Sequence, residues 1–458
     1  MAISIGYFGD ERLARNGRLM VQRVCERESV CLRKLADSRA EQARFQRFLS
    51  NAKVTVEKMI GQRAAFVAAV AAGRHVLAIQ DTSEVNYEAQ RGRKRRLGKV
   101  GNGRDVGLFV HPVLGIDADN EECLGLIDVQ VWRRTKRKAK NYKALPIELK
   151  ESHRWLKGGN QAKAVLADAA MVTVIDDREA DIYEKWARLP DHRTHLLTRA
   201  SRDRCLADGS RLFKALAALP EAHRFELDVS ARPAKKRSAR RACLAVGFGR
   251  VRIRRSTICT DPNAPAEIDL FAVEVRELDP PPGEKKPILW RLLTTHTVET
   301  IDQALTVIGW YRRRWHIEQL FRTLKRQGLR LEQSVVEDGA ALEKLAVIAL
   351  IAATTTMQLV LARTAADRPP PASRVFSPPQ IVVLAALVAT LQGRTVKQHN
   401  PFPPHSLAWA AWIIARLGGW TGYDSDKGNG PITMRDGLER FYGIVDGYHL
   451  AAQHLCST

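Results

Sequence analysis

The chain has 458 residues, enough for about two to four domains with buried cores. Lysine and arginine number 73 against 50 aspartate and glutamate residues, which gives a formal net charge of +23 and an isoelectric point of about 10.0. This charge argues against a cationic partner and favours nucleic acid or an anionic membrane surface. The seven cysteines show no CxxC pair and no Cys-His zinc spacing, so we expect reduced thiols in a cytosolic protein.

The first part of the chain changes from a helical to a β-type pattern. Residues 1 to about 70 are rich in Arg, Glu, Leu and Ala, which predicts short amphipathic helices, and they lack the apolar run of a signal peptide. From Arg74 the sequence HVLAIQ predicts a strand that stops at Asp81. An aspartate that ends a strand is commonly a turn residue. The position of Asp81 at the end of a strand therefore does not by itself indicate a function.

The next segments predict a hairpin, a helix and a second strand that ends in acids. VGLFVHPVLGI and CLGLIDVQVW predict two hairpin strands, preceded by a basic loop at residues 91–105. A helix is expected from about Leu145 to Leu156. The strand MVTVIDDREAD then ends at Asp176 and Asp177, where parallel α/β sheets place ligand-binding side chains. Because the two acids are adjacent, only one of them can point into such a site.

The segment from about 195 to 298 alternates between strand-like runs, which predicts a β-rich insertion. Trp290 lies in the last run, where a core tryptophan is the simplest interpretation. A capping pattern near Thr300 predicts a helix start. The apolar run Leu345–Leu361 contains three consecutive threonines, so we expect a buried core helix rather than a membrane span.

The stretch WYRRRWHIEQLFRTLK, residues 310–325, places one acid, Glu318, among many cations. On one continuous helix, with about 100° per residue, Tyr311, Arg314, Glu318 and Lys325 share a stripe about 60° wide. The phenol, guanidinium and ammonium groups of this stripe suit binding to a phosphate backbone, and its one carboxylate is left to ligate a metal. A solvated helical face with an Arg–Glu pair is the simpler alternative.

The order Tyr, Arg, Glu, Lys at these spacings resembles the YREK pattern of bacterial cut-and-paste transposases of the transposon-five type, in the insertion-sequence-four family. Asp81-Thr82 is similar to the context of that family's first acid, and residues 177–181 spell its DREAD sequence. The resemblance implies an α/β, ribonuclease-H-like core, a mixed sheet flanked by helices. It also implies a catalytic triad of Asp81, Asp177 and Glu318, and so selects Asp177 over Asp176.

The resemblance further implies how the chain is divided. Residues 1–70 would form a helical domain that binds the transposon end. Residues 71–365 would form the catalytic domain, with the β-rich insertion at about 195–298. Residues 366–458 would form a helical C-terminal domain that contacts a second protomer.

For activity, the resemblance implies metal-dependent end nicking, hairpin formation and opening, and strand transfer, with Mg²⁺ or Mn²⁺ as two ions held by the three acids. Further residues are expected to bind DNA: Tyr311, Arg314, Lys325, Arg178 and Trp290. The first four would contact phosphates, and Trp290 would stack beside a base flipped out of the duplex.

The expected partners are double-stranded DNA, as transposon terminal inverted repeats and as target, and a second copy of the chain in the DNA-bound complex. We expect no membrane partner and a cytoplasmic, nucleoid-associated location in bacteria. Two alternatives remain open. One is a metal-dependent structure-specific nuclease that cuts DNA without joining it, and the other is a transposase-derived DNA-binding protein without catalysis.

Overall fold

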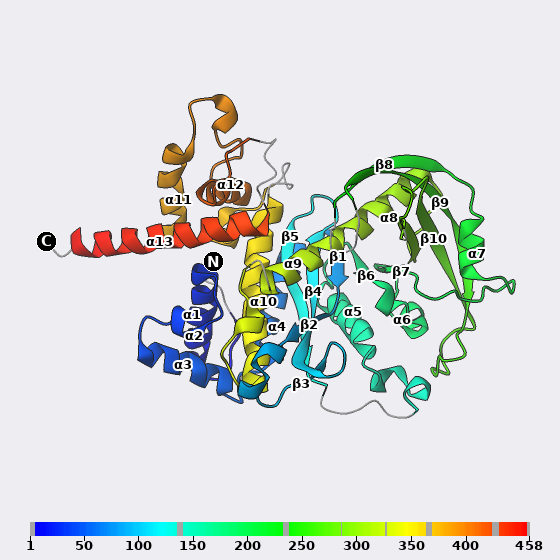
Figure 1. The fold of residues 1–458 in the computed structure, drawn as a ribbon, viewed down its shortest axis with the longest axis horizontal. Coiled ribbons are helices and arrows are strands. Elements are labelled where there is room, and N and C mark those ends of the chain that lie inside the picture. The colour runs from blue at the N-terminus through cyan, green and yellow to red at the C-terminus, as the bar shows by residue number, and fades with distance from the viewer. Residues whose placement is uncertain are drawn as a thin grey trace.

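The computed structural model describes residues 5–134, 141–231, 238–284, 286–325, 328–362, 369–423 and 430–455. In these residues one mixed sheet of 11 strands forms the centre of the molecule (Figure 1). The N-terminal and C-terminal helices gather at one end of this sheet and the green β-rich part lies at the other, with the long yellow helix α10 beside the sheet (Figure 1).

The part of the sheet that carries the predicted acids is built around β1 (His75–Gln80). This strand pairs antiparallel with β4 (Asp105–Asp117) and parallel with β6 (Met171–Asp176), and β6 pairs parallel with β7 (Thr194–Arg199). The strand β5 (Cys123–Trp132) forms the predicted hairpin with β4. The structure thus confirms the expected mixed sheet with an antiparallel edge.

The β-rich segment extends this same sheet. β11 (Leu289–Thr294) pairs antiparallel with β7, and β10 (Glu267–Glu277), β9 (Arg240–Arg254) and β8 (His223–Val229) follow in order. The alternating pattern of the sequence predicted these strands correctly. Because β11 pairs directly with β7, the added strands form one layer with the core.

The basic segment 91–105 is more ordered than the predicted loop. It contains the strand β3 (Gly98–Val100), which pairs with β4, as does β2 (Ser83–Asn86). Lys94 Nζ donates to the carbonyls of Ser334 and Val336. These contacts give the segment internal partners that local composition did not indicate.

The N-terminal helices have the amphipathic character that the sequence predicted, and they are α1 (Glu11–Arg27), α2 (Leu32–Leu35), α3 (Arg39–Ser50) and α4 (Val56–Ala71). The prediction of a helix from about Leu145 to Leu156 was wrong, because α5 spans His153–Val165. Residues 142–149 form two separate 3₁₀ turns, since Pro146 has an extended ψ of 151° between them. A proline with that ψ cannot continue a helix.

The prediction that residues 310–325 form one continuous helix was also wrong. The helix α8 (Ile301–Arg313) begins with the predicted cap, in which Thr300 accepts from the backbone of Gln303, and a second helix, α9, spans Trp315–Lys325. At the junction the Arg314 N–H bonds the carbonyl of Tyr311, three residues back. This tighter turn bends the chain at the arginine.

The apolar helix α10 (Gly339–Ala362) is the one helix in the described ranges long and apolar enough to cross a membrane. Its most apolar 18-residue window is 94% buried inside the protein, against α9, α1 and the sheet. The structure therefore confirms the predicted core helix. The C-terminal part consists of α11 (Pro378–Leu391), α12 (Leu407–Leu417) and α13 (Pro431–Leu455), and α13 projects beyond the body (Figure 1).

We predict that Leu350→Ala lowers the free energy of unfolding by about 2–5 kcal/mol, because it leaves a cavity in the fully buried α10. Urea unfolding followed by tryptophan fluorescence measures this. Leu450→Ala is the matched control, since Leu450 is 59% exposed on α13 and should cost little. Equal losses in both variants would contradict the placement of α10 in the core.

Candidate active site

The pairing of β1 with β6 places two of the predicted acids, Asp81 and Asp177, at the same position along neighbouring strands. The parallel register aligns Ile79 with Ile175, so Asp81 and Asp177 each follow two residues after an aligned pair. Side chains alternate along a strand, so residues two apart point to the same face. Asp81 and Asp177 therefore leave the sheet side by side at the carboxyl ends of neighbouring strands.

The third acid, Glu318, lies in the first turn of α9, close to the junction with α8. Arg314 donates to Asp81 Oδ2 at 3.1 Å and to Glu318 Oε1 at 2.8 Å, and the Tyr311 hydroxyl lies 3.5 Å from Asp177 Oδ1. The Arg314 side chain is only 8% exposed. The structure thus gathers Asp81, Asp177 and Glu318 around one buried guanidinium.

The burial of these groups and their closeness to one another shift the pKa values of Asp81 and Arg314. Burial raises the pKa of Asp81 to about 6, against the opposing effect of Arg314 and with a further rise from Asp177 and Glu318. Burial acts to lower the pKa of Arg314, yet Tyr311 and the three carboxylates hold that pKa above its ordinary value. The arginine stays charged and balances the acids.

The donor set fits a hard divalent cation, because carboxylate oxygens are the ligands that Mg²⁺ and Mn²⁺ prefer. In the described part of the chain no three His, Cys, Asp or Glu side chains are already spaced to hold one ion. The guanidinium of Arg314 accounts for the spacing, since it lies between Asp81 and Glu318. Ligation by all three acids thus requires exchanging contacts with Arg314 for contacts with the ion.

The neighbouring acid Asp176 has a different environment. Its side chain is fully buried and pairs with the fully buried Lys185, and Thr198 donates to it at 3.0 Å. Asp177, one residue later, points to the opposite face and is partly exposed beside Tyr311. Asp176 is therefore engaged within the protein core, whereas Asp177 faces the gathered acids.

The remaining predicted residues lie around this cluster. Arg178 is exposed next to Asp177, and Lys325 forms an ion pair of 3.7 Å with Glu332. Trp290 is partly buried on β11, with its ring 6.1 Å from that of Tyr311. The ammonium of Lys325 thus pairs with an acid outside the predicted triad.

Two residues near the site were missed from the sequence. Arg199, at the end of β7, interacts electrostatically with Tyr311 and Asp177. Trp315 is 40% exposed, and together with Trp290 it lines a cavity of 850 Å³. Trp315 could have been singled out because it lies within the basic 310–325 stretch, whereas nothing local to Arg199 reveals its pairing across the sheet.

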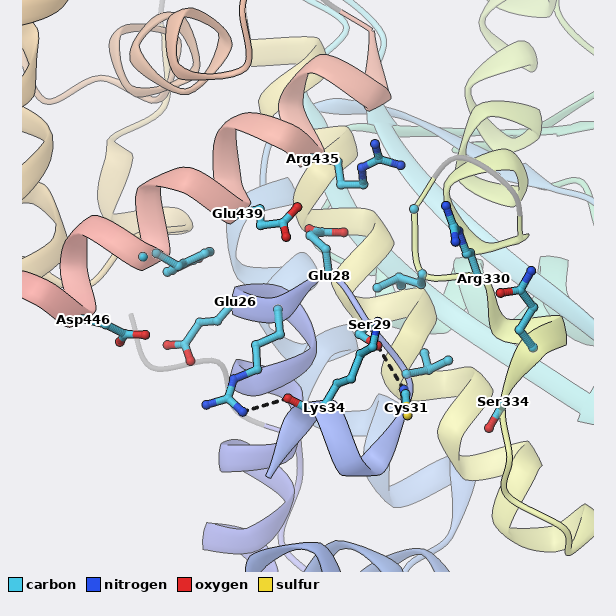
Figure 2. A pocket seen from close by; sticks show the side chains of 17 residues that line it. Glu26, Glu28, Ser29, Cys31, Lys34, Arg330, Ser334, Arg435, Glu439 and Asp446 are labelled. Atoms are coloured by element: carbon cyan, nitrogen blue, oxygen red, sulfur yellow. Dashed lines mark hydrogen bonds between the residues drawn. The ribbon is translucent and has the colours of Figure 1, made fainter. Parts of the chain in front are cut away.

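A separate cavity of 660 Å³ lies where α1, α13 and residues 328–334 meet (Figure 2). Glu28 from the end of α1 and Glu439 from α13 approach one another there (Figure 2). Burial raises the pKa of Glu28 to about 8, with Glu439 adding to the rise. None of the predicted catalytic or DNA-binding residues lines this cavity.

Comparison with known families gives the class of the protein. A model of the family described as Transposase DDE domain matches residues 101–355, more than half of the chain. The chain therefore belongs to the Transposase DDE domain family and is a DNA transposase, and its mixed sheet flanked by helices is consistent with a ribonuclease-H-like transposase core. The matched range includes Asp177 and Glu318, whereas Asp81 precedes it.

Among solved structures, the chain is similar to a piggyBac transposase, studied by cryo-electron microscopy as a synaptic complex with hairpin DNA. The TM-score is 0.36 at 10% identity, and the alignment covers 81% of this chain and 73% of that one. A similarity at this level carries no argument about the site.

We predict that Asp81 titrates at about 6 in the metal-free protein and that Arg314→Met raises this pKa further, because the neighbouring cation is lost. Carboxyl-carbon NMR during a pH titration measures both. The protonated Asp81 carboxyl contributes to the stability of the fold. This contribution is fully present below pH 3.8 and is lost as the pH rises through about 6. Arg12→Met is the control, and titration of Asp81 near its ordinary 3.8 would contradict the packing described.

Proposed function

We propose that this transposase carries out metal-dependent cut-and-paste transposition on double-stranded DNA, in the manner of the insertion-sequence-four family and its transposon-five type. Asp81, Asp177 and Glu318 are its catalytic acids. The observation that carries the proposal is their convergence on Arg314 from β1, β6 and α9. These acids lie 96 and 141 residues apart in the chain, and the fold brings them together.

In the proposed site the acids would hold two Mg²⁺ or Mn²⁺ ions, which is consistent with the general use of divalent metals by DDE transposases. Such ions activate the attacking oxygen and neutralise charge at phosphorus. The side chains of Arg314 and Tyr311 are already beside the acids, so they can orient a phosphate there. Arg178 and Lys325 extend this cationic surface and position the DNA without reading its sequence.

The proposed reaction sequence is the one that the resemblance to the transposon-five type implies. Hydrolysis at the transposon end forms a bond from a water oxygen to phosphorus and releases the 3′-hydroxyl. That hydroxyl then attacks the phosphate of the opposite strand, which forms a hairpin and releases the 3′-hydroxyl of the flanking DNA. Attack by a second water reopens the hairpin and releases the transposon 3′-hydroxyl, which attacks a target phosphate and displaces the 3′-hydroxyl of the target strand. Each step exchanges one phosphodiester oxygen for another, so one site with no covalent protein nucleophile serves them all.

The remainder of the chain suits the DNA and protein partners of this reaction. The net charge of +23 attracts a polyanion, and the N-terminal helices are proposed to bind the transposon ends. On the projecting part of α13, Ile444, Tyr448 and Leu450 are 38%, 49% and 59% exposed. Such apolar exposure at a helix end supports a homodimer in the DNA-bound complex, with α13 of each copy in the contact.

We predict that Glu318→Gln retains binding to DNA that carries the native transposon ends but loses cleavage, because a metal-ligating charge is removed while the basic surface remains. Cleavage of end-bearing plasmid with Mg²⁺, Mn²⁺ or EDTA measures this. Glu337→Gln is the matched control, since Glu337 is exposed and pairs with Arg95 away from the acids.

The outcomes separate the alternatives. Metal-dependent double-strand release and joining by wild type alone support a transposase, whereas release without joining favours a structure-specific nuclease. Binding without cleavage by wild type favours a DNA-binding protein without catalysis. Cleavage by Glu318→Gln at the wild-type rate would remove Glu318 from the proposed triad.

We predict that Trp290→Ala nicks transposon ends normally but forms hairpins poorly. The indole lies beside Tyr311 and lines the cavity next to α9, where stacking on an unpaired base offsets the lost base pair. Nicked and hairpin products separate on a denaturing gel. Phe402→Ala, on a partly buried aromatic residue of the C-terminal part, is the control. An equal loss of nicking and hairpin formation by Trp290→Ala would count against the stacking function.

A further inference from the structure

Behind the candidate acids, on the opposite face of the sheet, lies a chain of buried and partly buried hydrogen bonds. Arg154 Nε donates to Thr82 Oγ1 at 2.8 Å, and Thr82 Oγ1 lies 2.9 Å from His111 Nδ1. His111 Nε2 lies 3.0 Å from Gln80 Oε1, and Gln80 Nε2 donates to the carbonyl of Trp155 at 3.1 Å. We call this set the Arg154–Trp155 relay.

The donor and the acceptor of each hydrogen bond in the relay can be assigned in only one way, because the group at one end can only accept and the group at the other can only donate. The Trp155 carbonyl can only accept, so Gln80 donates its amide and presents its oxygen to His111. His111 must then carry its proton on Nε2 and accept at Nδ1, which makes the Thr82 hydroxyl the donor. The Thr82 oxygen in turn accepts from Arg154, whose guanidinium can only donate.

The surroundings favour the neutral histidine that this direction requires. His111 and Gln80 are fully buried, between β4, β1 and α5. Burial and the nearby charges of Arg154 and Lys185 hold the pKa of His111 well below its ordinary value. A side chain on Gly158 of α5 would overlap Gln80 Oε1, so glycine there leaves room for the amide.

Two members of the relay, Thr82 and Arg154, connect it to the segments that carry the acids. The Thr82 backbone N–H donates to Asp81 Oδ1 at 2.7 Å, which fixes the orientation of that carboxylate. Arg154 also donates to Glu179 Oε2 at 2.6 Å, two residues beyond Asp177. One guanidinium thus ties the segment after β1 to the segment after β6.

We propose that Thr82, His111 and Arg154 are positioning residues that set the orientation of Asp81 and its spacing from Asp177, and through them the affinity of the site for a divalent metal. The inference rests on the proposed function. The register of β1 and β6 aligns only the backbones of the strands. The bonds of the Thr82 side chain to His111 and Arg154 hold the Thr82 backbone, whose N–H contacts the Asp81 carboxylate. Partners of metal ligands commonly act in this way, and their loss lowers metal affinity.

Thr82→Val and Thr82→Ser test the relay as a matched pair, since valine keeps the shape and serine keeps the hydroxyl. Calorimetry with Mn²⁺ on the full chain should show affinity about tenfold weaker for valine and near wild type for serine. Thermal melting establishes that both variants are folded. Should Thr82→Val fail to fold, Arg154→Met interrupts the other end and should weaken Mn²⁺ binding likewise.

NMR of isotope-labelled histidine tests directly whether the Thr82 hydroxyl donates to His111. His111, assigned with His111→Gln, should show a proton on Nε2 and a hydrogen-bonded, unprotonated Nδ1. The Nδ1 signal should shift in Thr82→Val and not in Thr82→Ser.

A proton on Nδ1 in wild type, Mn²⁺ affinity unchanged by valine, or equal losses for valine and serine would overturn the inference. The absence of Mn²⁺ binding to wild type would overturn the inference and would also count against the proposed metal site. When wild type binds Mn²⁺, a failure of the relay and a failure of the proposed transposition reaction are distinguished, because neither readout needs DNA cleavage.

Discussion

The parallel pairing of β1 with β6 is the constraint on which the rest of the site depends. In this register Asp81 and Asp177 leave adjacent strands at the same level, while the residues before them, Gln80 and Asp176, turn to the opposite face. The two faces carry different chemistry. One holds the gathered acids, and the other holds buried polar side chains whose hydrogen bonds are made within the protein.

The buried polar groups keep this arrangement specific. Asp176 is paired with Lys185 at no exposure, and removing one partner of such a pair typically costs about 3–5 kcal/mol. The Gln80 side chain is hydrogen-bonded to His111 and to the carbonyl of Trp155. Each strand that leads to a candidate acid is thus held by the buried residue immediately before that acid. A shift of one residue in the register of these strands would expose Gln80 and Asp176 and bury Asp81 and Asp177.

The third acid depends on a different element. Glu318 lies on α9, and α9 packs on the buried helix α10, so the apolar core fixes its distance from the sheet. The bend at Arg314 directs the guanidinium toward Asp81 and Glu318 together. Not all of the basic charge of the chain is at the surface, because Arg314 is buried and balances the acids.

Local pattern in the sequence determined much of this protein. Alternating apolar runs predicted the strands and the capping residues predicted the start of α8, because each of these signals acts over a few residues. The choice of Asp81, Asp177 and Glu318 as candidate acids came from the family resemblance that the Asp81-Thr82, DREAD and 310–325 stretches carry. The bend at Arg314, the late start of α5, the nearness of Arg199 to Tyr311 and the relay through His111 needed the tertiary structure. Each of them depends on which side chains meet across strands and helices far apart in the chain, and no local spacing contains that information.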